Sequence, residues 1–83
     1  MLHDTFINEP IKVWVFFNNG IFPVAMNWRN RLIKFKKLIF ANTKRIGETK
    51  IISLVCTSDT ANFELEYNTE SHLWKLKKAM GKE

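Results

Sequence analysis

The sequence has little of what a stapled or cofactor-dependent small protein requires. It contains one cysteine, Cys56, so no intramolecular disulfide can form. His3, His72 and that cysteine fall short of the four ligands of a usual structural zinc site. The three glycines are isolated, so there is no glycine-rich phosphate loop. We therefore expect no disulfide, no metal and no cofactor.

Side-chain pairs for catalysis are missing as well. Cys56 lies in the apolar run 51–56, which is typical of a buried thiol rather than an activated nucleophile. Glu64 and Glu66 share a predicted strand face, but lysines are expected opposite both, so they do not form a catalytic carboxylate pair. No nucleophile–base pair stands out. We therefore expect a protein that is not an enzyme.

Long apolar runs are also absent. The longest is far below the roughly 20 residues that a membrane-spanning helix needs. The first residues, Met1–Asp4, lack the basic region and apolar run of a signal peptide. These features favour a cytoplasmic protein that does not associate with membranes.

What the chain does contain is apolar and aromatic residues at the density of a folded domain. Its 83 residues are 46% hydrophobic, with three Trp, seven Phe and one Tyr. This length allows one domain. We assign 1–9 to an N-terminal arm, 10–80 to a single β domain and 81–83 to a C-terminal tail.

The first strong signal is a hairpin. Residues 11–17 are β-branched and aromatic, and Asn19-Gly20 follows, the dipeptide that favours a type I′ turn. With that dipeptide at the tip, every pair on one face is apolar, which specifies the register. The predicted pairs are Phe17 with Phe22, Val15 with Val24, Val13 with Met26 and Ile11 with Trp28, and on the other face Trp14 with Ala25 and Phe16 with Pro23.

A second turn is predicted at Arg29–Asn30, because Asn tolerates left-handed geometry. It places Ile33 opposite Met26 and Phe35 opposite Val24, with Lys34 and Lys36 on the opposite face. Leu38 and Phe40 rejoin the inner face if one extra residue, a β-bulge, lies at Lys36–Lys37.

The second half of the chain contains three further predicted strands, with a loop before the first and another before the last. A polar and basic loop covers 41–48, and the apolar segment 49–57 is typical of a strand that is covered on both sides. The segment 63–67 alternates as a half-buried strand. A loop at 69–72 then pairs Tyr67 with Trp74, Leu65 with Leu76, Glu66 with Lys75 and Glu64 with Lys77.

The predicted fold is thus all-β: an antiparallel meander of about six strands in a strongly curved sheet or small barrel, whose first and last strands meet if it closes. An α+β alternative has a basic helix at 25–41, because Trp28, Leu32, Phe35 and Ile39 also share a helical face. The segment 71–80 is ambiguous in the same way, through Leu73, Leu76 and Met80.

Several short motifs resemble a known family. An aliphatic-aromatic strand, a glycine turn and a proline precede Trp28-Arg29-Asn30-Arg31, and Phe63-Glu64-Leu65 and Trp74-Lys75-Leu76 follow. This succession, over residues 10–80, resembles a small bacterial domain of unknown function. That domain occurs alone or at the C-terminus of Y-family DNA-polymerase-like proteins of the damage response. The family favours Gly where Asn30 stands, and this chain departs from it in the basic segment after Phe40. The resemblance implies no established activity.

Charge is segregated along the chain. Between residues 28 and 50 there are eight Lys or Arg and one acid, whereas residues 57–72 carry four acids and no Lys or Arg. A basic segment of this kind is either a solvated face that protects a sheet edge or a phosphate-binding surface. The candidate nucleic-acid-binding residues are Arg29, Arg31, Lys34, Lys36, Lys44 and Arg45.

Two functional hypotheses follow. In the first, a non-catalytic module binds nucleic acid, with phosphates at the cations and bases stacked on the outward aromatic residues Trp14 and Phe16. In the second, Trp14, Phe16 and Ala25 form an apolar patch that a protein partner or a second copy covers, or an edge strand pairs with a partner.

Overall fold

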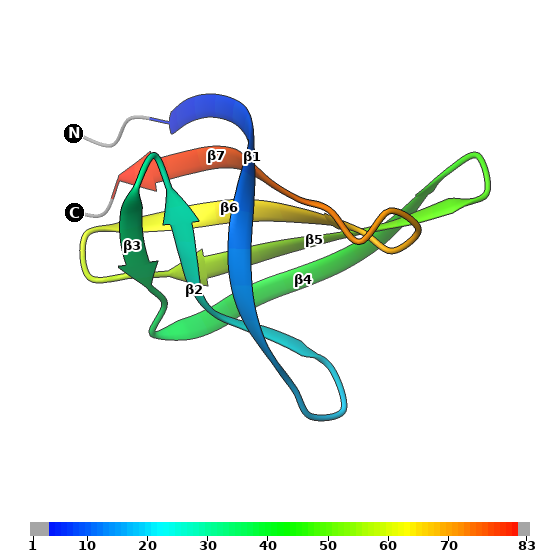
Figure 1. Ribbon diagram of the computed structural model, residues 1–83, viewed down its shortest axis with the longest axis horizontal. Coiled ribbons are helices and arrows are strands. Elements are labelled where there is room, and N and C mark those ends of the chain that lie inside the picture. Colours follow the sequence, from blue (N-terminus) through cyan, green and yellow to red (C-terminus); the bar gives the residue numbers. More distant parts are fainter. Residues whose placement is uncertain (1–3, 82–83) are drawn as a thin grey trace.

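The computed structural model describes residues 4–81, and within this range the chain forms seven antiparallel strands and no helix (Figure 1). The all-β prediction is confirmed, and the helices considered at 25–41 and 71–80 are wrong. The strands are β1 (Asp4–Phe17), β2 (Ile21–Trp28), β3 (Arg31–Lys34), β4 (Lys37–Ile46), β5 (Thr49–Thr57), β6 (Ala61–Asn68) and β7 (Trp74–Gly81).

The strands form one curved sheet in the order β3-β2-β1-β7-β6-β5-β4. The first and last strands pair, as expected for a sheet that curls round on itself. The edges β3 and β4 are consecutive in sequence, so the connection Phe35–Lys36 must cross from one edge to the other. The Phe35 amide bonds the Val24 carbonyl at 3.0 Å, and the Lys36 amide bonds the Thr57 carbonyl at 2.7 Å. An open seam therefore separates β3 from β4, and this short connection holds it together.

The long strand β1 belongs to both halves of the sheet. Residues up to Ile11 pair with β7, and residues from Lys12 onward pair with β2. Residues 4–9, predicted as a separate arm, thus form the first half of β1. Their alternation is hidden in the sequence because Asn8 adopts a left-handed φ of 58° and the register shifts between Phe6 and Glu9. The predictions for residues 1–3, 82 and 83 lie outside the described range.

The first hairpin keeps the predicted register only near its base. Val13 lies opposite Met26 and Trp14 opposite Ala25, as predicted, but the register shifts by one after Trp14. The loop is Asn18–Gly20 rather than a two-residue turn, and Val24 becomes the extra residue. Beside it lies Pro23, which lacks an N–H and so occurs in sheets at bulges or edges. The remaining pairs are Val15 with Pro23, Phe16 with Phe22 and Phe17 with Ile21.

The second turn is tighter and matches the prediction. Arg29 and Asn30 have φ of 52° and 62°, the two positive values that a type I′ turn requires. Met26 lies opposite Ile33 as predicted. The extra residue further along, however, is Ile39 and not a residue at 36–37.

The β4 strand shows two further corrections. Leu38 packs against the core, but Phe40 is 57% exposed instead of facing inward. The predicted loop at 41–48 is mostly strand: β4 runs to Ile46, which pairs with Thr49 across a turn containing Gly47. Because this end of β4 is exposed on both faces, its sequence has no apolar alternation. The hairpin projects at the right of Figure 1.

The last hairpin is predicted correctly near its turn. Tyr67, Glu66 and Leu65 face Trp74, Lys75 and Leu76. A shift after Leu65 then places Glu64 opposite Lys78 instead of Lys77. Lys77 is the extra residue at this bulge. Its ammonium donates to the Asn8 side-chain carbonyl at 3.0 Å, at the point where β1 changes register.

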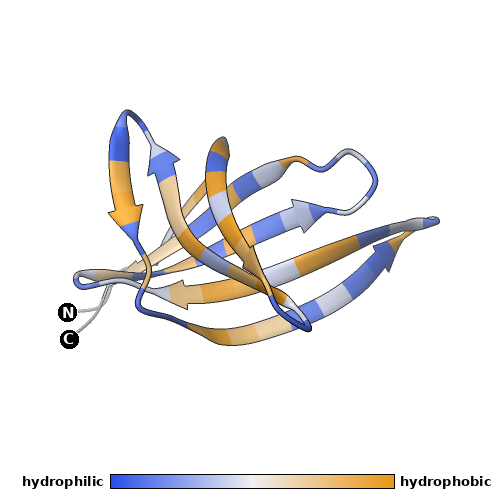
Figure 2. Cartoon of the chain, turned by 60° about the horizontal axis from the view of Figure 1, so that its bottom comes forward, coloured by the Kyte–Doolittle hydropathy of each residue, from blue (hydrophilic) through white to orange (hydrophobic). Residues whose placement is uncertain are grey.

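The core fills the concave side of the sheet. Figure 2 shows apolar and polar residues alternating along the strands, the pattern of strands that bury one face. Ring contacts of Phe63 with Trp28 and Phe35, with centroids 6.4 and 6.2 Å apart, join the two halves of the sheet. The buried cluster is Met26, Leu54, Cys56, Phe63, Leu65 and Leu76.

Candidate nucleic-acid interface

The six predicted cations do not form one patch. Arg29, Arg31, Lys34 and Lys36 lie at or beside β3, whereas Lys44 and Arg45 lie near the tip of the β4–β5 hairpin. These two regions are at opposite ends of the molecule in Figure 1. The prediction grouped them because it treated 41–48 as a loop, which could fold back, whereas an extended strand carries its residues away.

Three of the six cations are paired with acids. Arg29 pairs with Glu9, Lys36 with Asp59 at 2.8 Å, and Lys44 approaches Glu66 at 3.9 Å. The hydrogen bond to Asp59 and its charge raise the pKa of Lys36. In the part of the chain that the structure describes, Arg31, Lys34 and Arg45 have no acidic partner.

Glu9 on β1 binds two residues at the start of the β2–β3 turn, Trp28 and Arg29. Its carboxylate accepts hydrogen bonds from the Trp28 indole at 3.0 Å and from Arg29 Nε at 3.2 Å, and a further one from Arg29 Nη2. The guanidinium carbon lies 4.7 Å from the centroid of the Trp28 ring. The Arg29 and then the Trp28 hydrogen bonds lower the pKa of Glu9, and the bond to Glu9 raises that of Arg29. A cation is thereby held at a defined position in a left-handed turn.

The convex side of β1–β2–β3 carries a compact set of aromatic and basic side chains, here called the aromatic face. The strand register arranges it in three cross-strand rows: Phe16 beside Phe22, then Trp14, Ala25 and Lys34, then Lys12, Asn27 and Leu32.

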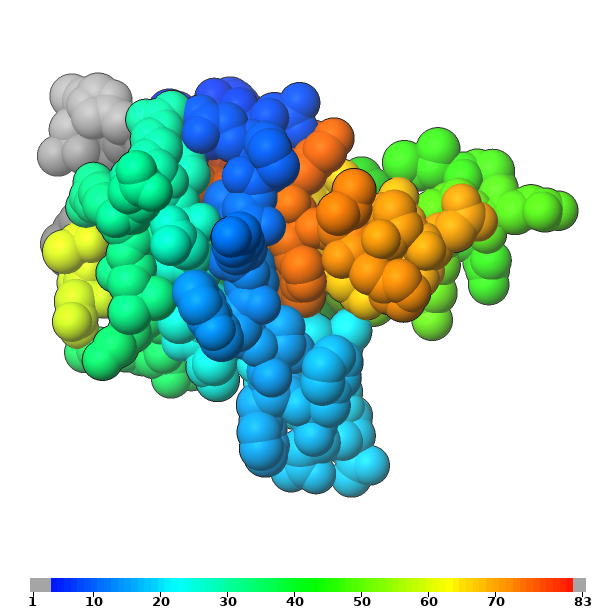
Figure 3. All heavy atoms as spheres, viewed as in Figure 1, coloured from blue at the N-terminus to red at the C-terminus, as the bar shows by residue number. Residues whose placement is uncertain are grey.

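The aromatic face is open to solvent. Trp14 is 49% and Phe16 is 58% exposed, as predicted for outward side chains, and Phe22 is 40% exposed. Figure 3 shows β1 to β3, blue to teal, covering the near side of the molecule at the left and centre. A contiguous exposed apolar patch of this kind marks an interaction surface.

Among the aromatic and basic members of the aromatic face, sequence reasoning missed Phe22 and Lys12. The predicted register put Phe22 opposite Phe17 on the inner side, and the bulge at Val24 turns Phe22 outward. Pro23 was the available signal, because it favours a bulge. Lys12 alternates with Trp14 and Phe16 along β1, so the same period of two could have found it.

The charge on this face has one sign. Between Glu9 and Glu48 the sequence contains no Asp or Glu. Glu9 lies at one rim, where it is bound by Arg29, and Asp59 lies across the seam, where it is bound by Lys36. None of the three rows of the aromatic face contains an acidic side chain, so the face presents Lys12 and Lys34 without a neutralising acid beside them.

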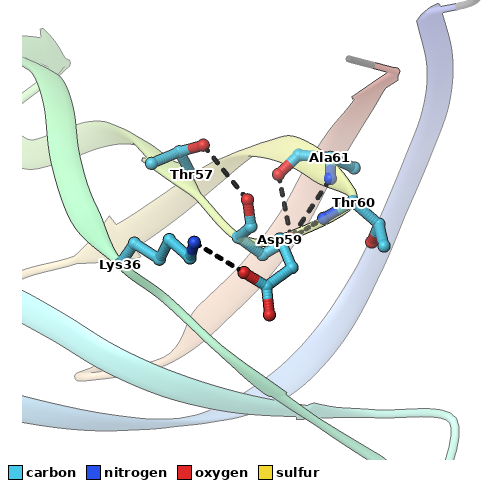
Figure 4. A network of polar contacts seen from close by, with 6 residues as sticks. Lys36, Thr57, Asp59, Thr60 and Ala61 are labelled. Atoms are coloured by element: carbon cyan, nitrogen blue, oxygen red, sulfur yellow. Dashed lines mark hydrogen bonds and ion pairs between the residues drawn. The ribbon is translucent and has the colours of Figure 1, made fainter. Parts of the chain in front are cut away.

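A polar network holds the seam beside β3 (Figure 4). The Ser58 hydroxyl accepts hydrogen bonds from the amides of Thr60 and Ala61 and donates to the Ala61 carbonyl at 3.0 Å. The Lys36 ammonium reaches from the β3–β4 connection to Asp59 in the same turn. This turn therefore anchors the end of β3 and with it the position of Lys34.

Other kinds of site find no support in the described residues. Within 4–81, no group of three or more His, Cys, Asp or Glu is arranged to hold a metal ion. The same residues include no helix long and apolar enough to cross a membrane.

Comparison with protein-family models, with characterised proteins and with solved structures finds no match to this chain. The resemblance to the domain associated with Y-family polymerases therefore stays a prediction.

Proposed function

We propose that this chain is a non-catalytic module that binds single-stranded nucleic acid on its aromatic face. The observation that carries the proposal is the cross-strand row of Trp14, Ala25 and Lys34, with Phe16 and Phe22 in the next row. Exposed aromatic rings stack unpaired bases regardless of sequence, and nearby cations bind the phosphates.

The length of the Trp14–Ala25–Lys34 row suits a single strand of nucleic acid. Trp14 and Lys34 are separated by two strand spacings, about 10 Å, with the small Ala25 between them. A base can stack on the exposed indole while a phosphate of the same strand approaches the lysine. Duplex DNA hides the faces of its bases, so we expect it to bind more weakly.

The proposed surface is narrower than the sequence prediction. It includes Lys12 and Lys34 as phosphate contacts, and Trp14, Phe16 and Phe22 as stacking groups. Arg31 falls outside it, because it alternates with Lys34 and shares the side of Ile33, which packs against the core. Lys44 and Arg45 lie on the distant hairpin, and a Debye length of about 8 Å at physiological salt screens most of their influence.

The test is binding of labelled oligothymidylate of about ten nucleotides, within the usual site size of small β-barrel folds, followed by fluorescence anisotropy. With about two phosphate contacts, log K should fall with log salt at a slope of about −1.4. Trp14→Ala should weaken binding about 5- to 100-fold, the equivalent of one lost stacked base.

The matched control is Phe40→Ala, which removes another half-exposed aromatic ring, on β4. It should leave the affinity unchanged. The proposal fails if oligothymidylate does not bind at about 50 mM salt, if the salt slope is zero, or if Trp14→Ala and Phe40→Ala behave alike.

A second candidate is a protein docking surface at the same place. Leu32 on the aromatic face, and Phe17 and Val24 beside it, are also exposed, which is more apolar surface than stacked bases need. Self-association would appear in sedimentation equilibrium, and Leu32→Glu would abolish it. A monomer at high protein concentration argues against a second copy as the partner.

A further inference from the structure

A depression of about 490 Å³ lies at one end of the aromatic face. Its lining comes from β1, from the end of β2 and from the turn between β2 and β3. The lining residues are Pro10, Ile11, Lys12, Asn27, Arg29 and Asn30. Its volume falls within the range of small-ligand sites, about 300–1,000 Å³.

The depression continues the path of the aromatic face. Lys12 lies opposite Asn27, one row beyond Trp14 and Ala25. Pro10, Lys12 and Trp14 alternate along β1 and so point to the same side of the strand. A strand stacked on Phe16 and Trp14 and running along β1 would therefore place its next nucleotide in the depression.

The lining contains more hydrogen-bond donors than acceptors, and its side-chain acceptors are two amide oxygens. Lys12 contributes an ammonium, and Asn27 and Asn30 each contribute an amide donor and an amide acceptor. Of the five N–H groups of Arg29, two donate to Glu9, and three are left. No carboxylate lines the depression, and the nearby Glu9 is occupied by Trp28 and Arg29.

The Arg29 side chain and the backbone of Asn30 are also held in place. Arg29 is fixed on one side by Glu9 and on the other by the Trp28 ring, 4.7 Å away. Asn30 lies in the same type I′ turn, at a φ of 62°. A group fixed before binding loses less conformational freedom when a ligand arrives, which favours selective recognition.

We propose that this depression is a nucleotide subsite that selects guanine; the inference rests on the proposed binding of single strands. Guanine presents two adjacent acceptors, O6 and N7, which Arg or Lys bind in the commonest specific base contact. Its ring N–H and amino group suit the amide oxygens of Asn27 and Asn30. Adenine replaces one of the two acceptors by a donor, so the cations meet only N7, and an Asn amide that pairs with adenine N6 and N7 takes that acceptor from them.

The test compares oligothymidylate with versions in which one terminal thymidine is replaced by guanine or by adenine, at either end because the strand direction is not assumed. One of the two guanine oligonucleotides should bind about 5- to 100-fold more tightly than oligothymidylate, the discrimination of one good base contact. The adenine oligonucleotides should gain less than the guanine oligonucleotide, since adenine offers the cations one acceptor instead of two. An equal or larger gain with adenine overturns the guanine assignment.

Asn30→Gly is the diagnostic variant. Glycine adopts the left-handed conformation of Asn30 without strain, so the turn persists while the amide is lost. The ratio of the affinity for the guanine oligonucleotide to that for oligothymidylate should fall several-fold. Asn19→Gly is the matched control, because Asn19 has a φ of 55° in the loop at the far end of the aromatic face. It should retain the guanine preference.

Each result decides a different question. If oligothymidylate binds through Trp14 but guanine gives no gain, the subsite is wrong and the proposed function stands. If a 5′-phosphate gives the gain and guanine does not, the depression binds phosphate and the guanine assignment is overturned. If no oligonucleotide binds, both proposals fall together.

Discussion

The two sides of the molecule use apolar residues in opposite ways. The buried cluster draws Leu54 and Cys56 from β5, Phe63 and Leu65 from β6, and Leu76 from β7. On the other side, β1 to β3 contribute Met26 to that cluster and leave large apolar side chains outside. Those exposed residues are Phe6, Trp14, Phe16, Phe17, Phe22, Val24 and Leu32.

The apolar residues of β5 to β7 therefore stabilise the fold, whereas the exposed ones of β1 to β3 are left for binding a partner. Burying a large aliphatic or aromatic side chain contributes about 1.5–3 kcal/mol, so β5 to β7 supply much of the apolar stabilisation. The exposed residues of β1 to β3 contribute little of that energy to the isolated chain. A surface that stays apolar without stabilising the fold is the surface on which a partner gains most by binding.

The largest expected difference between the buried cluster and the aromatic face is seen when the same substitution is made in each. Leu65→Ala empties a fully buried position and should lower the free energy of unfolding by about 2–5 kcal/mol. Leu32→Ala, on the aromatic face, should change it by about 0.5 kcal/mol or less. Urea unfolding measures both. Equal losses would mean that the aromatic face is part of the folding core.

A smaller effect is expected at the one thiol. Cys56 is fully buried, and desolvation raises its pKa to about 12, so at neutral pH it stays protonated and shielded. A thiol reagent should modify it only after unfolding. Cys56→Ser should cost about 1–3 kcal/mol, because a hydroxyl replaces the thiol in an apolar setting.

The matched variant is Ala25→Cys in a chain that carries Cys56→Ser. Its thiol would lie on the aromatic face between Trp14 and Lys34, and it should react in the folded protein. If the native Cys56 reacts as fast as this exposed thiol, then β5 and β6 open readily, and the contrast between the two sides is lost.

The smallest effect is expected at the ion pair that holds the rim of the aromatic face. Glu9 has a pKa below its ordinary 4.5 in the folded chain because Arg29 and Trp28 bond its charged form. Its stabilisation is therefore complete above that value and is lost as the pH falls toward the folded pKa. Glu9→Gln should lower the melting temperature slightly at neutral pH, and the difference should disappear in acid.

Glu70→Gln, in the exposed β6–β7 turn, is the control for Glu9→Gln and should have no such pH dependence. The Trp28 fluorescence should also change in Glu9→Gln, since the indole loses its charged acceptor. A melting temperature that responds equally to both substitutions would show that the Glu9 contacts do not support the turn.

Turns and nearby pairs were predictable from local chemistry. Asn30 indicated the β2–β3 turn, and the pairs of Trp14 with Ala25 and of Tyr67 with Trp74 followed from matching apolar faces. The errors begin at bulges, beside Val24, Ile39 and Lys77, where one extra residue shifts every later pair. A bulge bends its strand and increases the local twist, and its position depends on the curvature of the whole sheet. Apart from Pro23 beside Val24, no local pattern recorded that position.

Some features of the candidate site were likewise predictable from the sequence and others were not. Trp14 and Phe16 were predictable as outward residues from their alternation with Val13 and Val15. The separation of Lys34 from Lys44 was not, because it depends on whether the basic segment after Phe40 is a loop or a solvated strand. Nor was the pairing of Arg29 with Glu9, residues 20 positions apart that the kinked β1 brings together.

The order of side chains on its own thus favoured an all-β chain over the α+β alternative, and it located two of the hairpin turns and most of the residues that face the interior. Those properties follow from the two-residue period of a strand and from the backbone preferences of Asn and Gly. The tertiary structure alone decided which aromatic rings share a row with which cations. That arrangement depends on bulges and on the closing of β1 against β7, which join residues distant in sequence through the shape of the entire sheet.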